Sequence, residues 1–140
     1  MKFVFVFLIL FCWGISLQAQ EVVIHTEKGP IIFNVAVADT PELAEKGLMF
    51  RSQLNENEGM LFVDDTDRIW HMWMKNTFIP LDMIFVTRDG YIVKIIANAQ
   101  PHDLTLLSSD QPVGGVLEIG GGLCAKKGIA VGDKVISDHL

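Results

Sequence analysis

The chain has 140 residues, half of them hydrophobic, and this length leaves room for one domain of ordinary size. Its 17 acidic and 11 basic side chains give a formal net charge of −6. Nucleic acids and anionic membrane surfaces bind through basic patches, so this balance argues against both as partners.

The first 19 residues have the composition of a secretory signal peptide. Lys2 precedes an apolar run, residues 3–13, that is shorter than the roughly 20 residues of a membrane-spanning helix. The small residue Ala19 ends the segment, and we predict cleavage after it; retention of the segment as an anchor is the alternative. The remaining chain, residues 20–140, is then exported to the periplasm or secreted, with no membrane contact once the signal peptide is removed.

Residues 20–140 show no repeat and no linker-like stretch, and we interpret them as a single domain. Cleavage would remove Cys12 and leave Cys124 as the only cysteine, so no disulfide within the chain is possible. The fold therefore depends on its hydrophobic core.

Strand patterns with turn residues between them dominate this part of the chain. Residues 22–26 and 31–38 predict a hairpin with Gly29 and Pro30 in its loop. Further strands are predicted at residues 59–63, 69–74, 81–87, 91–97, 116–119 and 134–137. The Asp89-Gly90 pair is a strong hairpin signal between two of them.

Two short helical segments interrupt the strands. The first is predicted near residues 40–48, where Thr40 can cap the helix, Pro41 suits its first turn and Gly47 lies near its end. The second is a helical turn near residues 124–127. The pattern predicts a mainly β domain, a compact sandwich or barrel-like fold with one short helix and one helical turn.

Several unusual groups of residues occur along the chain in a fixed order. They are Gly47-Leu48-Met49-Phe50-Arg51, Gly59-Met60-Leu61-Phe62, Trp73-Met74-Lys75-Asn76-Thr77, Ile79-Pro80-Leu81-Asp82, Val116-Leu117-Glu118 and Gly132-Asp133-Lys134-Val135. With them the chain resembles the domain of unknown function 192 family over roughly residues 22–137. The resemblance implies a compact, mainly β, sandwich-like domain that is often exported, and it carries no established activity.

Polar residues gather around an aromatic strand between residues 73 and 82. If the strands at 69–75 and 81–87 are antiparallel neighbours, Lys75 and Asp82 lie at the same end and can pair. One interpretation is a cleft in which Lys75 and Arg51 hold an anionic group of a ligand beside an aromatic wall. The other is a hairpin with a buried ion pair.

The site residues that we predict for this cleft are Arg51, Trp73, Lys75, Asn76, Asp82 and Glu118. Glu118 alternates with apolar neighbours, so it can face either solvent or the cleft, and the sequence leaves both open. The ligand would be a small molecule, and an envelope protein is the alternative partner.

Methionines provide a second hypothesis, because thioether sulfur suits Cu(I) outside the cytoplasm. Strand alternation sends His71 and Trp73 to one face and Met72 and Met74 to the other. Met60, Met72 and Met74 could then meet across strands and bind copper. Methionine also fills irregular cores, and the sequence implies no other cofactor.

Cys124 is the candidate nucleophile of an enzyme. It precedes a predicted helical turn whose N-terminus would lower a thiol pKa, although its sequence neighbours include no His or Asp partner. His102 lies in a separate loop. A small buried side chain is the simpler role for Cys124. The sequence therefore favours a ligand-binding or accessory module over an enzyme.

Overall fold

The computed structural model describes residues 19–140, which form nine strands and two short helices. The strands are β1 (Gln20–Thr26), β2 (Gly29–Ala38), β3 (Glu58–Arg68), β4 (His71–Met72), β5 (Leu81–Val86), β6 (Ile92–Ala99), β7 (Leu107–Ser108), β8 (Val113–Gly120) and β9 (Lys134–Ile136); the helices are α1 (Pro41–Lys46) and α2 (Leu123–Lys127). The mainly β class is confirmed. The predicted signal peptide lies outside the described residues apart from Ala19, and its cleavage stays a prediction.

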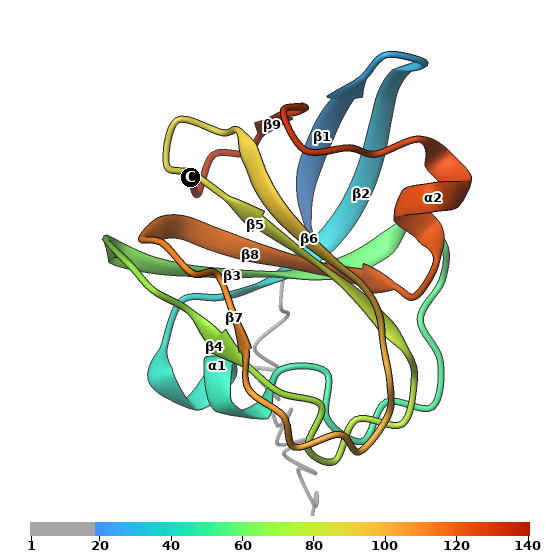
Figure 1. Cartoon of the computed structure of the whole chain (residues 1–140), viewed down its shortest axis with the longest axis vertical. Helices are drawn as coiled ribbons and strands as arrows, with labels where there is room; N and C mark the ends of the chain where they lie inside the picture. The colour runs from blue at the N-terminus through green and yellow to red at the C-terminus, as the bar shows by residue number, and fades with distance from the viewer. Residues whose placement is uncertain (1–18) are drawn as a thin grey trace, which may run out of the picture.

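Seven strands form one curled sheet in the order β6-β5-β8-β3-β2-β1-β9 (Figure 1). Its strand pairs are antiparallel except β2 and β3, which run parallel. The two edge strands meet at one end, where Tyr91 bridges to Lys134 and the Val135 N–H donates to the Gly90 carbonyl at 2.7 Å. Gly90 has a φ of 88°, and a β-carbon there would overlap the Val135 carbonyl oxygen. This approach requires glycine.

The local predictions hold in the first part of the sheet. β1 and β2 form the expected hairpin, with a tighter turn that pairs Thr26 with Gly29. The Thr40 hydroxyl accepts a hydrogen bond from the Leu43 N–H at 3.2 Å and caps α1. Neither helix of the described chain is long and apolar enough to cross a membrane.

The predicted pairing of the strands at 69–75 and 81–87 is wrong. Both edges of β5 are already bonded, one to β6 and one to β8. β4 pairs instead with β7, through His71 with Ser108 and Met72 with Leu107. No strand was predicted at β7, because a strand of two residues has no pattern to recognise.

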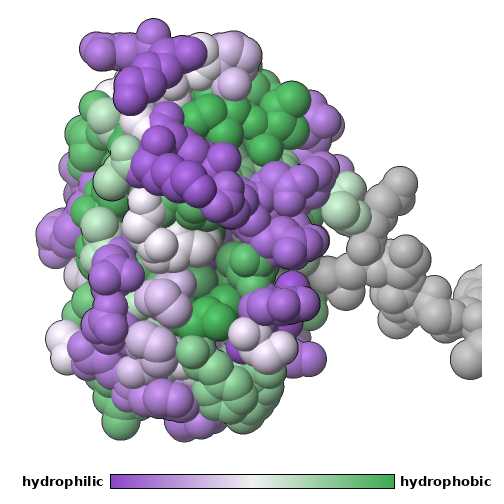
Figure 2. Space-filling model, turned by 90° about the vertical axis from the view of Figure 1, so that its right-hand side faces the viewer, coloured by the Kyte–Doolittle hydropathy of each residue, from purple (hydrophilic) through white to green (hydrophobic). Residues whose placement is uncertain are grey.

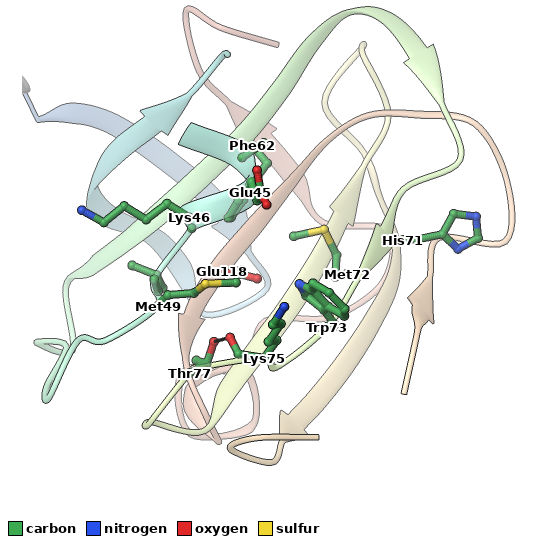
Figure 3. A pocket seen from close by; sticks show the side chains of 13 residues that line it. Glu45, Lys46, Met49, Phe62, His71, Met72, Trp73, Lys75, Thr77 and Glu118 are labelled. Carbon is green, nitrogen blue, oxygen red and sulfur yellow. Dashed lines mark hydrogen bonds between the residues drawn. The ribbon is translucent and has the colours of Figure 1, made fainter. Parts of the chain in front are cut away.

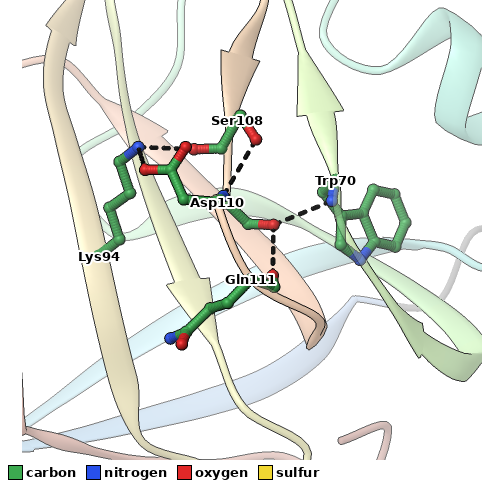
Figure 4. Close-up of polar contacts among 6 residues, drawn as sticks. Trp70, Lys94, Ser108, Asp110 and Gln111 are labelled. Atoms are coloured by element: carbon green, nitrogen blue, oxygen red, sulfur yellow. Dashed lines mark hydrogen bonds and ion pairs between the residues drawn. The ribbon is translucent and has the colours of Figure 1, made fainter.

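Side-chain hydrogen bonds hold this small β4–β7 sheet in place (Figure 4). The backbone N–H of Trp70, just before β4, donates to Ser109 Oγ at 3.0 Å. Lys94 of β6 donates through Nζ to the Ser108 carbonyl at 2.7 Å and to Asp110 Oδ2 at 2.5 Å. The small sheet is therefore bonded to the edge of the large one.

The central strands send alternate side chains into two separate hydrophobic cores. In β8, Leu117 and Ile119 belong to the first core, whereas Val116 belongs to the second. The second core contains Phe62, Trp70, Met72, Met74, Met83 and Phe85. Alternation therefore places Glu118, between Leu117 and Ile119, on the side of the second core.

Polar and charged side chains cover much of the molecular face on the α2 side, with apolar groups between them (Figure 2).

Candidate functional site

A pocket of about 150 Å³ opens where α1 and the turn after it approach β8 and the β4 segment (Figure 3). Its lining comes from residues 44–49, from Phe62 of β3, from residues between 71 and 77, and from Glu118 of β8. These four parts of the chain are far apart in the sequence, so only the tertiary fold forms the pocket.

Glu118 is a buried carboxyl group in this pocket. The residue is only 4% exposed to solvent. Its neighbours across the sheet are Met60 of β3 and Met83 of β5. Burial raises the pKa of Glu118 from 4.5 to about 8, and within the described chain no hydrogen bond or neighbouring charge offsets this effect. Near pH 7 the group is therefore mostly a neutral acid that faces the pocket without a partner.

Trp73 and Lys75 form the wall and the mouth of the pocket. Lys75 Nζ lies 5.0 Å from the centre of the Trp73 ring, and both residues are exposed to solvent. In Figure 3, Lys75 and Trp73 extend toward the pocket, whereas Lys46 and His71 point away from it. Within the described chain, Lys75 and Glu118 form no ion pair, because Lys75 Nζ lies more than 4.0 Å from the Glu118 carboxyl oxygens.

The predicted alternation along the β4 segment is present. Met72 and Met74 are buried, while His71 and Trp73 are exposed on the other face. Met60 joins them in the second core. Residues 19–140 contain no cluster of three His, Cys, Asp or Glu side chains that could hold a metal ion. Binding of Cu(I) by the methionines stays a prediction.

Asp82 does not line the pocket, and the predicted Lys75–Asp82 pair is not formed. Asp82 Oδ1 accepts hydrogen bonds from the N–H groups of Asn98 at 2.7 Å and Gly122 at 2.9 Å, and Oδ2 accepts one from Cys124 N–H at 2.8 Å. Lys75 and Asp82 do not meet because side chains alternate along β5. Asp82 therefore points to the sheet face opposite that of Met83 and the second core. Its role here is to anchor the start of α2.

The same contacts correct the prediction for Cys124. Its pKa lies well above the usual range, because the thiol is buried and the Asp82 carboxylate lies beside it. The start of α2 does not activate the thiol, because the N–H groups of Gly122 and Cys124 there already donate to Asp82. His102 packs against Phe78, with ring centres 5.4 Å apart, and neither it nor Cys124 lines the pocket.

Two further predicted residues lie beside or away from the pocket. Arg51 is exposed and forms an ion pair with Glu58 at 3.7 Å, over a different surface hollow. Asn76 borders a shallow hollow next to the pocket, and its carbonyl accepts the Phe50 N–H at 2.9 Å. Of the six predicted residues, the structure brings Trp73, Lys75 and Glu118 together.

The contribution of α1 and of Phe62 to the pocket was not predicted from the sequence. Gly47 has a φ of 47°, and a β-carbon there would lie 3.2 Å from Cζ of the Phe62 ring. Glycine therefore lets the end of α1 approach β3 and bring Met49 to the pocket. The Gly47-Leu48-Met49 motif was the available signal, but it served only for the family resemblance.

The fold and the pocket define a small domain with a curled β-sheet and a buried acid facing a small pocket. Over residues 22–137 the chain matches the DUF192 family, described as an uncharacterized ACR, and it belongs to that family. No curated protein matches it.

Two solved structures are similar to the chain. A protein of unknown function from Novosphingobium aromaticivorans is 44% identical, with a TM-score of 0.84, and the match covers 88% of this chain and 89% of that one. A putative transcription regulator from Sinorhizobium meliloti is 38% identical, with a TM-score of 0.86, and the match covers 91% of this chain and 99% of that one.

Proposed function

We propose that this chain is an exported ligand-binding or accessory module that holds a small molecule in the pocket between α1 and β8. The observation that carries this proposal is the unpartnered Glu118 carboxyl. Burying an acid without a partner costs several kcal/mol, and perturbed acids in pockets concentrate at functional sites. Asp82 offers a contrast within the same sheet, because three N–H groups stabilise its charge.

The aromatic and apolar lining supports the same proposal. Phe62, Met72 and Trp73 supply apolar surface, while Glu118 and Lys75 supply polar groups at separate positions. Small-molecule sites commonly combine an apolar lining with a few polar groups that orient the ligand. Arg51 and Asp82 are outside this proposed site.

The other hypotheses have less support. Copper binding rests on the thioethers of Met60, Met72 and Met74, of which Met72 lines the pocket. The description of the Sinorhizobium protein as a putative transcription regulator suggests nucleic acid as a partner, but the net charge of −6 disfavours DNA. An envelope protein is the partner to seek if no small molecule binds.

The test is thermal denaturation of the full chain, expressed with its N-terminal segment so that any cleavage takes place in the producing cell. The compounds are small amino acids, organic acids, amines, sugars and Cu(I). A ligand that binds only the folded state stabilises it by about 2.7 kcal/mol at a hundred times its dissociation constant. Mass spectrometry of the same sample shows whether residues 1–19 are removed.

Two variants make the test specific. Glu118→Gln removes the ionisable carboxyl of the buried acid, and Glu27→Gln makes the same change in the exposed β1–β2 turn. We expect one class of compound to stabilise the wild type and the Glu27 variant but not the Glu118 variant. Equal stabilisation of all three proteins, or of none, would contradict the proposal.

A further inference from the structure

Two ionisable side chains extend into the pocket at different depths. Glu118 is buried beneath it, whereas Lys75 is exposed at its mouth beside Trp73. They form no ion pair, and Lys75 is not among the causes that set the acidity of Glu118. The other ionisable residues in the lining are Glu45, which is exposed at the rim, and Lys46 and His71, which point away (Figure 3).

This arrangement distinguishes between classes of ligand. A simple cation could pair with the Glu118 carboxylate, but it would leave the positive charge of Lys75 at the mouth without a counterpart. A simple anion could pair with Lys75, but it would leave the buried acid without a charged partner. A molecule with both charges satisfies both side chains, since an ammonium group donates to a carboxylate and a carboxylate accepts from lysine.

We infer that the pocket binds a small zwitterion, with its ammonium group on Glu118 and its carboxylate toward Lys75. This inference rests on the proposed function and names the ligand class for the same pocket. The volume of about 150 Å³ limits the ligand, because an engineered cavity of about that volume in another protein holds benzene. A short amino acid of about five to eight heavy atoms meets this limit.

Binding of the ammonium group requires Glu118 in its charged form. Because burial raises the pKa of Glu118 to about 8, the free protein must release a proton when it binds near pH 7. We expect the affinity to rise by up to about tenfold per pH unit between pH 6 and pH 8. The His71→Gln variant must show the same pH dependence, because the His71 side chain points away from the pocket.

The experiment titrates the full chain by calorimetry with glycine, β-alanine and γ-aminobutyrate, which carry the same two charges at increasing separation. Ethylamine and propionate are the matched single-charge ligands for β-alanine. We expect one amino acid to bind at least tenfold more tightly than ethylamine and propionate. Glu118→Gln should reduce its affinity at least tenfold, and Lys75→Gln should remove its advantage over ethylamine. The control variants Glu27→Gln and Lys28→Gln, in the exposed β1–β2 turn, should change neither the affinity for the amino acid nor its advantage over ethylamine.

The outcomes separate this inference from the proposed function. If propionate or ethylamine binds as tightly as every amino acid, the inference that the ligand is a zwitterion is wrong. If the amino acids fail but another compound, Cu(I) included, stabilises the chain only when Glu118 is present, the inference falls and the pocket remains a binding site. If no compound gives a Glu118-dependent effect, both fall.

Discussion

Replacing Glu118 by glutamine tests the energetic basis of the site. Glutamine has nearly the shape of the protonated acid and stays neutral at every pH. In the wild type, the folded chain holds the Glu118 proton up to about pH 8, while an unfolded chain releases it near pH 4.5. The folded state therefore binds more protons than the unfolded state between these values, and stability falls as the pH rises through this range.

The interval from 4.5 to 8 sets the size of the effect. At about 1.4 kcal/mol per pH unit, the buried acid costs about 5 kcal/mol of stability above pH 8 and about 3 kcal/mol at pH 7. We expect Glu118→Gln to match the wild type near pH 4.5 and to be more stable by about 3 kcal/mol at pH 7. This difference corresponds to a rise in Tm on the order of 10 °C.

Urea denaturation at pH 5, 6, 7 and 8, followed by tryptophan fluorescence, measures this difference. Glu27→Gln is the control, because its carboxyl is exposed and should give no such trend. A difference between Glu118→Gln and the wild type that stays constant with pH would refute the reasoning. A gain in stability from removing a site residue is the trade-off expected where function retains an unfavourable group.

The remaining predictions concern the Asp82 anchor of α2, the Cys124 thiol and the Thr40 cap of α1. Asp82→Asn should destabilise the fold by about 2–3 kcal/mol, because an amide group would face the Cys124 N–H; urea denaturation measures this, and an unchanged midpoint would show that the anchor contributes little. Cys124 should resist a thiol reagent at pH 8 in the native chain and react once the chain unfolds; rapid native labelling would contradict its burial and raised pKa. Thr40→Ala should cost about 1 kcal/mol through the lost cap of α1, and a loss below a few tenths would mean that water replaces the hydroxyl.

Features set by neighbouring residues were predicted well. The β1–β2 hairpin, α1 with its Thr40 cap, and the turn before β6 all follow from turn and cap chemistry that acts over a few residues. The face of Met72 and Met74 followed from strand alternation for the same reason. The strand ends were predicted less well, since β3 extends through polar residues to Arg68 whereas β4 is limited to His71–Met72.

Pairing between distant strands was not predictable in the same way. The expected neighbour of β4 was β5, but β6 and β8 occupy both edges of β5. The sequence places Lys75 and Asp82 seven positions apart, yet the sheet separates them onto different sides. Local patterns carry no information about which of several possible edges a strand will occupy.

By itself, the sequence determined the family, the mainly β class, the local turns and caps, and the alternation that gave Glu118 two possible directions. Only the tertiary structure decided that Glu118 lies in a central strand between Met60 and Met83, without a partner, facing a pocket with Lys75 at its mouth. The physical reason is that burial is collective. The pKa of Glu118 and the shape of the pocket depend on side chains that lie up to about 70 positions away along the chain and that are brought together only when the sheet curls.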